Sequence, residues 1–390
     1  MSPALFLLLA FQDPIALEAV AGASGAKDAP VRFELPKGFD ASRPWRLVAA
    51  DGTEVPVQFA GGAALLLAKG EMEPNSKRSY RLEPAAPSAF PLLEVTEPEG
   101  KALVLRAGGR NVLRYNSATV QPPPGMDPGF ARNAYVHPIW TPGGRVVSNE
   151  FPVHHHLHQC GLWLAWKDTA FEGRKMSFWY PKAGDSKVEF KEVEAKFQGP
   201  VSAGFRARHD WTDLKAPGGA KLALRETWDV AAYATDDAFL FDVVSVQACA
   251  GESPVTHTKI SYGGFAFRGS AAWEGTGTMD FLTSEGKDRK TGNETRARWV
   301  VMKGDVGGKP ASIGFLAHPS NFRAPEPLRL HPGMPYFCFA PTQQGDFTTE
   351  PGRPMTWRYR MVVRDGPLEA RELELLWAGF ADPPRAAVAK

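Results

Sequence analysis

The chain has 390 residues and a nearly balanced charge, with 45 Lys and Arg against 43 Asp and Glu. Hydrophobic residues make up 43% and charged residues 23%, which is typical of a folded chain with one large or two smaller domains and excludes general disorder. A net charge of +2 without a long basic run excludes a nucleic-acid-binding surface, and it also argues against charge-driven attachment to lipid.

The aromatic and turn-forming residues indicate an all-β protein. The sequence holds 24 Phe, 11 Trp and 8 Tyr together with 38 Gly and 34 Pro. Aromatic residues suit a pleated surface, and Gly and Pro mark the turns between strands. The three cysteines, Cys160, Cys249 and Cys338, include no C-x-x-C pair, so at most one disulfide and no thiolate zinc site are expected.

The N-terminus contains a continuous apolar run from Ala4 to Phe11. The run is far too short to span a bilayer, and it is typical of the core of a signal peptide. We therefore predict a signal peptide over residues 1–14 and export to the periplasm or the cell exterior; the alternative is that the run forms a first strand. No other stretch is long and apolar enough to cross a membrane, so no integral membrane association is expected.

Residues 15–84 predict a small N-terminal β module. Val31–Leu35 alternates apolar and charged residues, as a half-buried strand does, and Asp51-Gly52 predicts a turn between two further strands. Residues 85–90, rich in Pro, Ala and Ser, predict a linker. The rest of the chain, 91–390, is expected to form one large β domain.

Three patterns in this second part carry specific expectations. In the strand expected over Leu222–Val230, Glu226 falls on the apolar face, where a charge needs a partner or a task. In Val188–Phe197 the alternation slips, which predicts a β-bulge near Lys191. Only Pro367–Phe380 has the spacing of a helix.

The most informative segment is Phe151–Trp166, in which four histidines lie within five residues. If the segment is extended, His154, His156 and His158 point to one side, with Cys160 behind them. Alternate histidines on a strand can hold one metal ion, and neutral imidazoles can equally act as acids, bases or sugar hydrogen-bond partners. The pattern indicates a site but leaves the choice between a metal and acid–base chemistry open.

Other polar residues are candidates for the rim of the same site. His137 and Arg145 flank the turn Pro142–Gly144, Tyr262 precedes a Gly-Gly pair, and His318, Asn321 and Arg323 share a turn-rich segment. We expect these residues to bind substrate. Neither a phosphate-binding glycine loop nor a G-x-S-x-G nucleophile motif is present, so neither chemistry is expected.

Several of these motifs resemble the PmoA-like family, which is catalogued as methane oxygenase PmoA. The resemblance covers roughly residues 30–380 and rests on the segments His137–Gly144, Phe151-Pro152, His156–Trp163, Tyr262–Gly264, His318–Arg323 and Trp357–Arg360. Where the family's run has Asp, Pro, His and Arg, this chain has His155, Leu157, Gln159 and Cys160. A membrane copper oxygenase is not implied, because such an enzyme needs membrane spans.

The closing segment, Pro335–Pro341 to Arg358–Arg360, is also similar to the end of galactose-mutarotase-like supersandwiches. The fold that follows is a large antiparallel β-supersandwich preceded by a small β-sandwich module. The expected function is binding or transforming a sugar-like polar small molecule at a concave, histidine-lined site. As an enzyme it would use His156, His158 and Glu226 in acid–base chemistry of the isomerase, hydrolase or lyase type.

Two alternatives stay open. One is a histidine-ligated metalloprotein, oxygenase-like as the family name suggests, in which His154, His156 and His158 hold a divalent metal. The other is a carbohydrate-binding module without catalysis. No cofactor other than this possible metal is expected, and the expected partner is a small molecule or carbohydrate rather than nucleic acid.

Overall fold

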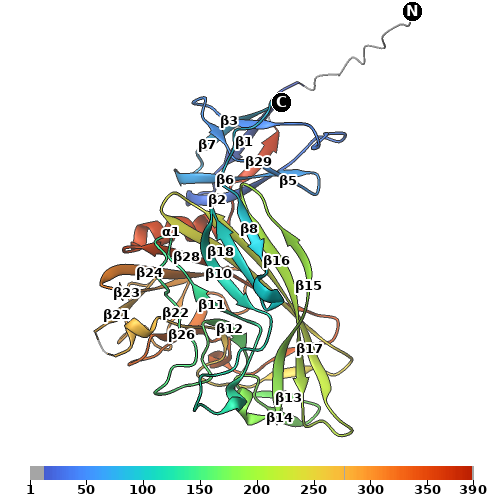
Figure 1. Cartoon of the computed structure of the whole chain (residues 1–390), viewed down its shortest axis with the longest axis vertical. Helices are drawn as coiled ribbons and strands as arrows, with labels where there is room; N and C mark the ends of the chain where they lie inside the picture. The colour runs from blue at the N-terminus through green and yellow to red at the C-terminus, as the bar shows by residue number, and fades with distance from the viewer. Residues whose placement is uncertain (1–12, 276, 389–390) are drawn as a thin grey trace, which may run out of the picture.

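The computed structural model describes residues 13–275 and 277–388, and Figure 1 shows that they form a small module and a much larger one. The apolar run Ala4–Phe11 lies outside the described residues. The chain passes from the small module to the large one through residues 84–92, which carry no regular structure between two strands. Within this segment Ser88 binds back to the small module, since its hydroxyl donates to Glu54 Oε2 at 2.9 Å.

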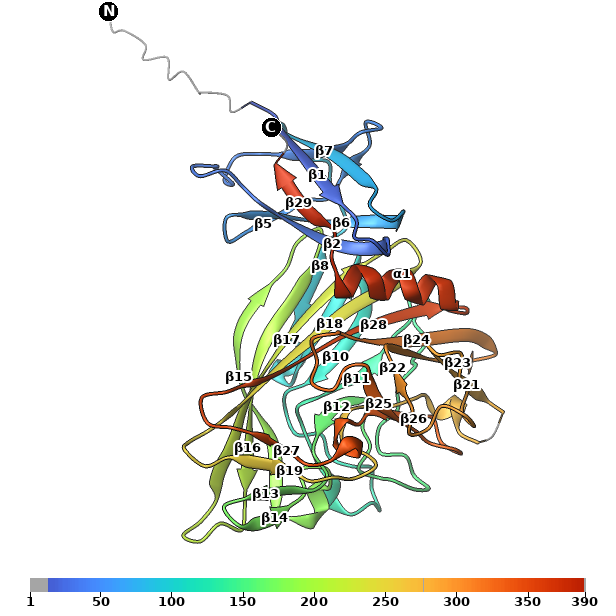
Figure 2. The same ribbon diagram turned by 180° about the vertical axis from the view of Figure 1, so that it is seen from behind.

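Two sheets packed around one apolar core make up the small module. Leu17, Phe33, Leu66 and Leu82 are among the fully buried side chains between them. The three-stranded sheet runs β2 (Ala26–Glu34), β6 (Ala63–Met72), β5 (Gln58–Ala60), and the five-stranded sheet runs β29 (Arg385–Val388), β1 (Ile15–Val20), β7 (Lys77–Glu83), β3 (Arg46–Ala49), β4 (Glu54–Val55). Strand β29 comes from the C-terminal end of the chain and pairs with β1, so both ends of the described chain belong to this module (Figure 2).

The large module is a sandwich of two extensive sheets. The nine-stranded sheet runs β22 (Arg296–Ala297), β25 (Glu326–Leu330), β26 (Tyr336–Phe339), β20 (Gly264–Arg268), β12 (Leu162–Ala165), β11 (Tyr135–Ile139), β10 (Arg110–Asn116), β9 (Ala102–Ala107), β8 (Leu93–Thr96). The eight-stranded sheet runs β15 (Ser186–Phe197), β16 (Ala203–Asp213), β17 (Lys221–Ala234), β18 (Ala238–Cys249), β28 (Met355–Asp365), β24 (Lys309–Ala317), β23 (Trp299–Val306), β21 (Met279–Thr283). A four-stranded sheet, β14 (Arg174–Met176), β13 (Thr169–Phe171), β19 (Val255–His257), β27 (Phe347–Thr349), lies at the end farthest from the small module (Figure 1).

Side-chain alternation gives the nine-stranded sheet two distinct faces. Phe265 stacks on Tyr359 with ring centroids 3.9 Å apart, and Phe267 packs on Phe315 at 4.8 Å, so these phenylalanines face the eight-stranded sheet. The next residue in the strand, Arg268, therefore points to the opposite face, and Tyr336 is its register partner on β26. We call this opposite side the outer face.

The predicted fold class is confirmed: the chain is an antiparallel all-β protein, with a large sandwich preceded by a small one. Helical structure in the described residues is confined to the single helix α1 (Ala370–Ala381) and short 3-10 turns at Pro98–Gly100, Pro128–Phe130, Pro181–Ala183, Ala271–Trp273 and Pro341–Gln344. None of these helices is long and apolar enough to cross a membrane.

Helix α1 fills the space between the eight-stranded sheet and the small module (Figure 2). Its buried Leu373, Leu376 and Phe380 pack with Leu240 and Val362 of the sheet. The spacing of three and four residues places these side chains on one face of the helix, which is why the helix could be predicted from Pro367–Phe380.

Two finer predictions are also confirmed. The pairing of β15 with β16 shifts register between Phe190 and Glu192, which places a bulge at Lys191. In β17, Glu226 is 1% exposed and lies on the same face as the buried Leu224 and Trp228. A charged side chain is therefore enclosed between the sheets, where it needs hydrogen-bond donors.

Candidate functional site

A small polar pocket lies against the outer face of the nine-stranded sheet and has a volume of about 110 Å³. Its floor includes Tyr336 of β26 and Arg329 of β25, and loops supply the remaining walls. We call it the histidine pocket; it is lined by His156, His158, Gln159, Trp179, Tyr180, Tyr262, Arg329, His331, Met334 and Tyr336. The sequence segments that meet here lie up to 180 residues apart, from His156 to Tyr336.

The histidine segment enters the pocket as a loop, so the condition of an extended segment, under which His154, His156 and His158 would share one side, is not met. Residues 151–159 form bends and a turn, and His156 has a φ of 55°. The loop returns to the sheet at Gly161, whose φ is 53° and where an added Cβ would lie 1.9 Å from the carbonyl oxygen of Val136. Only glycine fits this close approach of two backbones. The tight return places His156 and His158 together, while His154 is exposed and does not line the pocket.

The protonation of the histidines follows from their hydrogen bonds. The indole N–H of Trp179 donates to Nε2 of His158 at 3.1 Å, and the backbone N–H groups of Gly333 and Met334 donate to Nδ1 of His331 at 3.1 and 3.0 Å. An imidazole nitrogen that accepts carries no hydrogen, so the N–H lies on Nδ1 of His158 and on Nε2 of His331. Each ring thus keeps one donor for another partner.

These imidazoles are neutral near pH 7. Burial, followed by the charge of Arg132, lowers the pKa of His158 to about 3. Burial, followed by the charge of Arg329, lowers the pKa of His331 to about 4. The pKa of His156 is also lowered, by partial burial and by the neighbouring His155. The rings therefore act in the pocket as hydrogen-bonding groups and not as cations.

Aromatic side chains beside the histidines form another part of the lining. The hydroxyls of Tyr180 and Tyr262 are hydrogen-bonded at 3.0 Å, and burial followed by that hydrogen bond raises the pKa of Tyr262. The rings of His158 and Tyr180 meet edge to face at 4.5 Å, and Lys167 lies 5.2 Å above the ring of Tyr180. Ring faces beside polar groups are the composition that sugar-binding pockets use, because a sugar has both apolar faces and hydroxyl edges.

A second polar cluster lies on the outer face, on strand β11, which neighbours the β12 strand that follows the histidine loop. The hydroxyl of Tyr135 donates to Oε2 of Glu150 at 2.5 Å, and Nε2 of His137 is 3.8 Å from Oε1 of the same carboxylate. Burial raises the pKa of Glu150, and burial followed by the charge of Arg114 lowers the pKa of His137 to about 4. His137 was predicted to bind substrate; the structure places it in this cluster, where Ser148 binds its Nδ1 at 2.8 Å.

Glu226 does not line the histidine pocket, contrary to the expectation that it would meet His156 and His158. It lies between the two sheets, where His209 Nδ1 donates at 2.9 Å and the indole of Trp211 at 3.0 Å. Further donors are Trp228 at 2.8 Å, Ser245 at 2.5 Å and Gln247 at 3.1 Å. Burial acts to raise the pKa of Glu226, but the hydrogen bonds from His209, Ser245 and Trp228 lower it below its usual value. Sequence reasoning found the buried charge but not its partner, because His209 lies on the neighbouring strand β16.

The remaining predicted rim residues are held in contacts elsewhere. His318 Nδ1 binds the Ser320 hydroxyl at 2.8 Å and its ring packs on Phe380 of α1. Asn321 is buried and donates to Glu326 at 2.8 Å. Arg323 donates to backbone carbonyls, that of Gly345 at 2.7 Å among them, and Arg145 pairs with Asp365. None of these four lines the histidine pocket. Turn-rich segments hold polar side chains for local structure as well as for ligands, and here the local contacts prevail.

Residues that the sequence analysis missed complete the pocket. Arg329 lies in β25 and His331 in the turn after it. Trp179 and Tyr180 come from the loop after β14. The available signals were weak: a histidine directly before Pro332-Gly333 and an aromatic run before Pro181. Both patterns are common in ordinary turns, so only the fold shows that they converge.

Across the described ranges, no group of three or more His, Cys, Asp or Glu side chains is placed to hold a metal ion. The rings of His156, His158 and His331 are neighbours, with centroids 5.9 and 5.8 Å from that of His156. The three-histidine ligand set His154, His156 and His158 is not assembled, because the loop turns His154 out to solvent.

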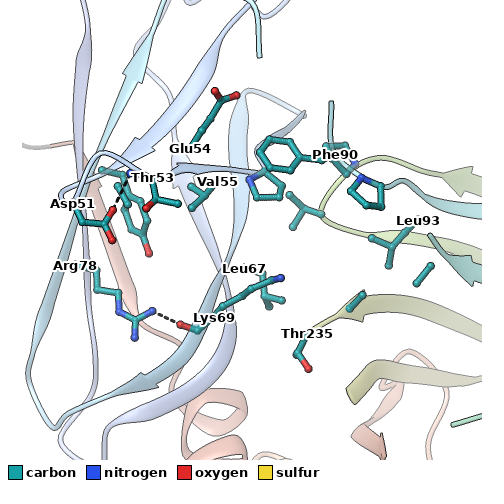
Figure 3. Close-up of a pocket in the computed structure, with 18 of the residues that line it drawn as sticks. Asp51, Thr53, Glu54, Val55, Leu67, Lys69, Arg78, Phe90, Leu93 and Thr235 are labelled. Atoms are coloured by element: carbon teal, nitrogen blue, oxygen red, sulfur yellow. Dashed lines mark hydrogen bonds between the residues drawn. The ribbon is translucent and has the colours of Figure 1, made fainter. Parts of the chain in front are cut away.

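A larger cavity of about 980 Å³ lies between the two modules (Figure 3). Leu67 of the small module faces it from one side and Phe90 and Leu93 from the other. Its charged groups are engaged: Lys69 pairs with Asp236 at 2.7 Å, and Arg78 donates to the carbonyls of Lys69 and Glu71. The smaller histidine pocket is the better candidate site, because it offers N–H groups of His158 and His331 that their protein contacts do not use.

Fold and site together define a β-supersandwich protein with a polar pocket on the outer face of its larger sheet. Residues 102–378, more than half of the chain, match the family described as "Family of unknown function (DUF6807)", and the chain belongs to this family. The resemblance to the PmoA-like family was wrong, since the match is to DUF6807 and nothing indicates PmoA. The oxygenase alternative therefore loses the support of that family name.

No curated protein matches the chain. Among solved structures, it is similar to a protein in the glycosyl hydrolase family 38 from Enterococcus faecalis, with 12% identity, a TM-score of 0.44, and coverage of 97% of this chain and 47% of that one. The chain thus spans about half the length of that structure. The Slr1438 protein from Synechocystis sp. PCC 6803 gives 10% identity, a TM-score of 0.30 and coverage of 72% and 97%. A galactose mutarotase related enzyme from Lactobacillus acidophilus gives 10%, 0.29, and coverage of 71% and 100%.

Proposed function

We propose that this protein binds a sugar-like, polyhydroxylated small molecule in the histidine pocket. One observation carries the proposal: hydrogen-bonding groups from separate loops converge on a single cavity with an aromatic wall. His158 and His331 each keep an N–H that their protein contacts do not use, and Tyr180 and Tyr262 hold each other in place with hydroxyls that can take further partners. Preorganised polar groups beside ring faces recognise a sugar at low entropic cost.

The size of the pocket restricts the ligand. Its volume of about 110 Å³ is well below the roughly 300–1,000 Å³ of pockets that enclose drug-sized molecules. It therefore suits part of one sugar ring. That ring could be the terminal unit of a larger glycan whose remainder stays in solvent. His156 is exposed at the mouth and would meet the part of the ligand that enters last.

Binding is better supported than hydrolysis. Glycoside hydrolysis generally uses a pair of carboxyl groups that flank the scissile bond. The described residues that line the pocket include no Asp or Glu, and Glu226, which was expected to supply a carboxylate, is saturated with donors elsewhere. The neighbouring Glu150 is engaged by Tyr135.

The test is saturation-transfer NMR on the intact protein with a panel of pyranoses, neutral and acidic. The wild type is expected to bind at least one member, and His156→Ala and Tyr262→Phe to weaken that binding about 3- to 10-fold at an unchanged melting temperature. His154→Ala is the matched control, because His154 is exposed and outside the pocket. Equal binding by all three variants would place the ligand elsewhere, and binding of no sugar would remove the proposal.

A further inference from the structure

We propose that the ligand of the histidine pocket carries an anionic group, so that the preferred ligand is a sugar bearing a carboxylate, sulfate or phosphate. This inference rests on the proposed function and specifies its ligand class. It follows from two features of the pocket: the polarity of its hydrogen-bonding groups and the state of its one lining arginine.

The pocket is rich in donors. His331 offers Nε2–H and His158 offers Nδ1–H, because their other nitrogens accept from Met334 and Trp179. Gln159 uses its oxygen to accept from Arg268 at 2.7 Å, which leaves its amide N–H₂ as the group with capacity for a ligand. No carboxylate is found among the lining residues that the structure describes. A neutral sugar edge needs acceptors as well as donors, whereas an anion needs donors alone.

Arg329 supplies a charge that the protein does not neutralise. This half-buried guanidinium donates to the side-chain oxygen of Asn293 at 3.0 Å, and no described carboxylate forms an ion pair with it. Among the other cations nearby, Arg268 pairs with Glu274 and Lys167 with Asp168 at 2.7 Å, whereas Arg132 donates to the backbone carbonyl of His158 at 2.8 Å and does not line the pocket. Arg329 and His331 line the same pocket, so the guanidinium lies close to the pocket's donors.

A cation that is partly removed from water without a counter-ion is unfavourable, and an anionic ligand relieves that cost. Arginine is well suited to this role because its planar fork binds carboxylate, sulfate or phosphate oxygens through parallel hydrogen bonds. The neutral histidines then donate further hydrogen bonds to the anionic group without adding a positive charge of their own. Arg329 would thus select the anionic sugar, while the aromatic wall would accept either form.

The experiment compares glucose with glucuronate, glucose 6-sulfate and glucose 6-phosphate, and galactose with galacturonate, by calorimetric titration of the intact protein. At least one anionic sugar is expected to bind about 10-fold or more tightly than its neutral parent. Arg329→Gln should remove this preference and Arg329→Lys should keep part of it. Arg225→Gln is the control, because Arg225 is exposed on the other sheet and donates to the Ala250 carbonyl at 3.1 Å.

The possible results separate the two proposals. Equal affinity for neutral and anionic sugars would overturn the anion preference and leave the proposed function standing. A preference that persists in Arg329→Gln, with the variant folded as judged by its melting temperature, would overturn the role of Arg329. Binding of none of the probes, neutral or anionic, would count against the proposed function itself. Tight binding of inorganic phosphate or acetate as strongly as the sugar would also overturn the inference, since the sugar ring would then contribute nothing.

Discussion

The two polar clusters of the large module differ in how completely their hydrogen bonds are satisfied. Around Glu226, the carboxylate receives donors from five side chains, and even His209 has a second partner, the hydroxyl of Tyr115 at 2.6 Å from its Nε2. In the histidine pocket, the N–H groups of two imidazoles and one guanidinium can still donate hydrogen bonds to a ligand. A saturated cluster has nothing left to offer a ligand, so it stabilises the fold, whereas an unsaturated cluster at a cavity can recognise one.

Removal of the buried carboxylate of Glu226 is the strongest test of whether this cluster stabilises the fold. Glu226→Ala is expected to lower the free energy of unfolding by roughly 3–5 kcal/mol, because it leaves His209, Trp211 and Trp228 with buried donors that have lost their acceptor. Urea denaturation followed by fluorescence measures the change. Glu189→Ala, a more exposed position on β15, is the control and should change stability by less than about 0.5 kcal/mol. If the Glu226→Ala protein folds with normal stability but no longer binds sugar, Glu226 belongs to the binding site and the comparison is wrong.

The next prediction concerns a second buried carboxyl, Glu326, which has fewer partners. Burial raises its pKa to about 7, although Asn321 at 2.8 Å and the Tyr359 hydroxyl at 3.0 Å lower it in part. Because the folded protein holds this proton more tightly than the unfolded chain, the contribution of Glu326 to stability falls as the pH rises from about 4.5 to about 7. The expected loss is on the order of 3 kcal/mol.

Glu326→Gln tests this assignment, since an amide resembles the protonated carboxyl but does not titrate. The variant should lose this component of the pH dependence, so that its stability relative to the wild type is higher at pH 8 than at pH 5. Denaturation curves at the two pH values give the answer. The same difference between wild type and variant at both pH values would mean that Glu326 keeps an ordinary pKa.

A smaller effect is expected in the pocket itself. His331→Phe keeps a ring of similar shape but removes Nε2–H and the acceptor for the amides of Gly333 and Met334. Ligand affinity should fall about 10-fold, and the free energy of unfolding by about 1 kcal/mol, so binding is lost out of proportion to stability. Titration and denaturation of the same sample measure both. A large loss of stability with normal affinity per folded molecule would show that His331 is structural.

The smallest effect is expected at His154, which belongs to the same run of histidines but is exposed. His154→Ala should change the free energy of unfolding by less than about 0.5 kcal/mol and leave sugar binding unchanged. Metal analysis of the untagged wild type and variant adds a second readout. A bound divalent metal that His154→Ala releases would revive the metal hypothesis and show that the loop closes around an ion.

Much of the fold could be predicted because its signals are local. Alternation along β17 placed Glu226 on the buried face, and the slip of that alternation located the bulge at Lys191. Helix α1 was visible from the spacing of Leu373, Leu376 and Phe380. Part of the candidate site was visible too, since three of its ten lining residues, His156, His158 and Tyr262, were chosen from composition and neighbouring turns.

The rest of the site depended on which distant segments meet. The sequence by itself determined that a charge would be buried at Glu226 and that several histidines would lie together. Only the tertiary structure decided that His209, on the adjacent strand, would satisfy that charge, and that Arg329 and His331 would join His156 at the outer face. The physical reason is that side-chain alternation along a strand is fixed by the local backbone. Partners across strands and loops depend on register and on loop paths such as the tight return at Gly161, which no short-range pattern specifies.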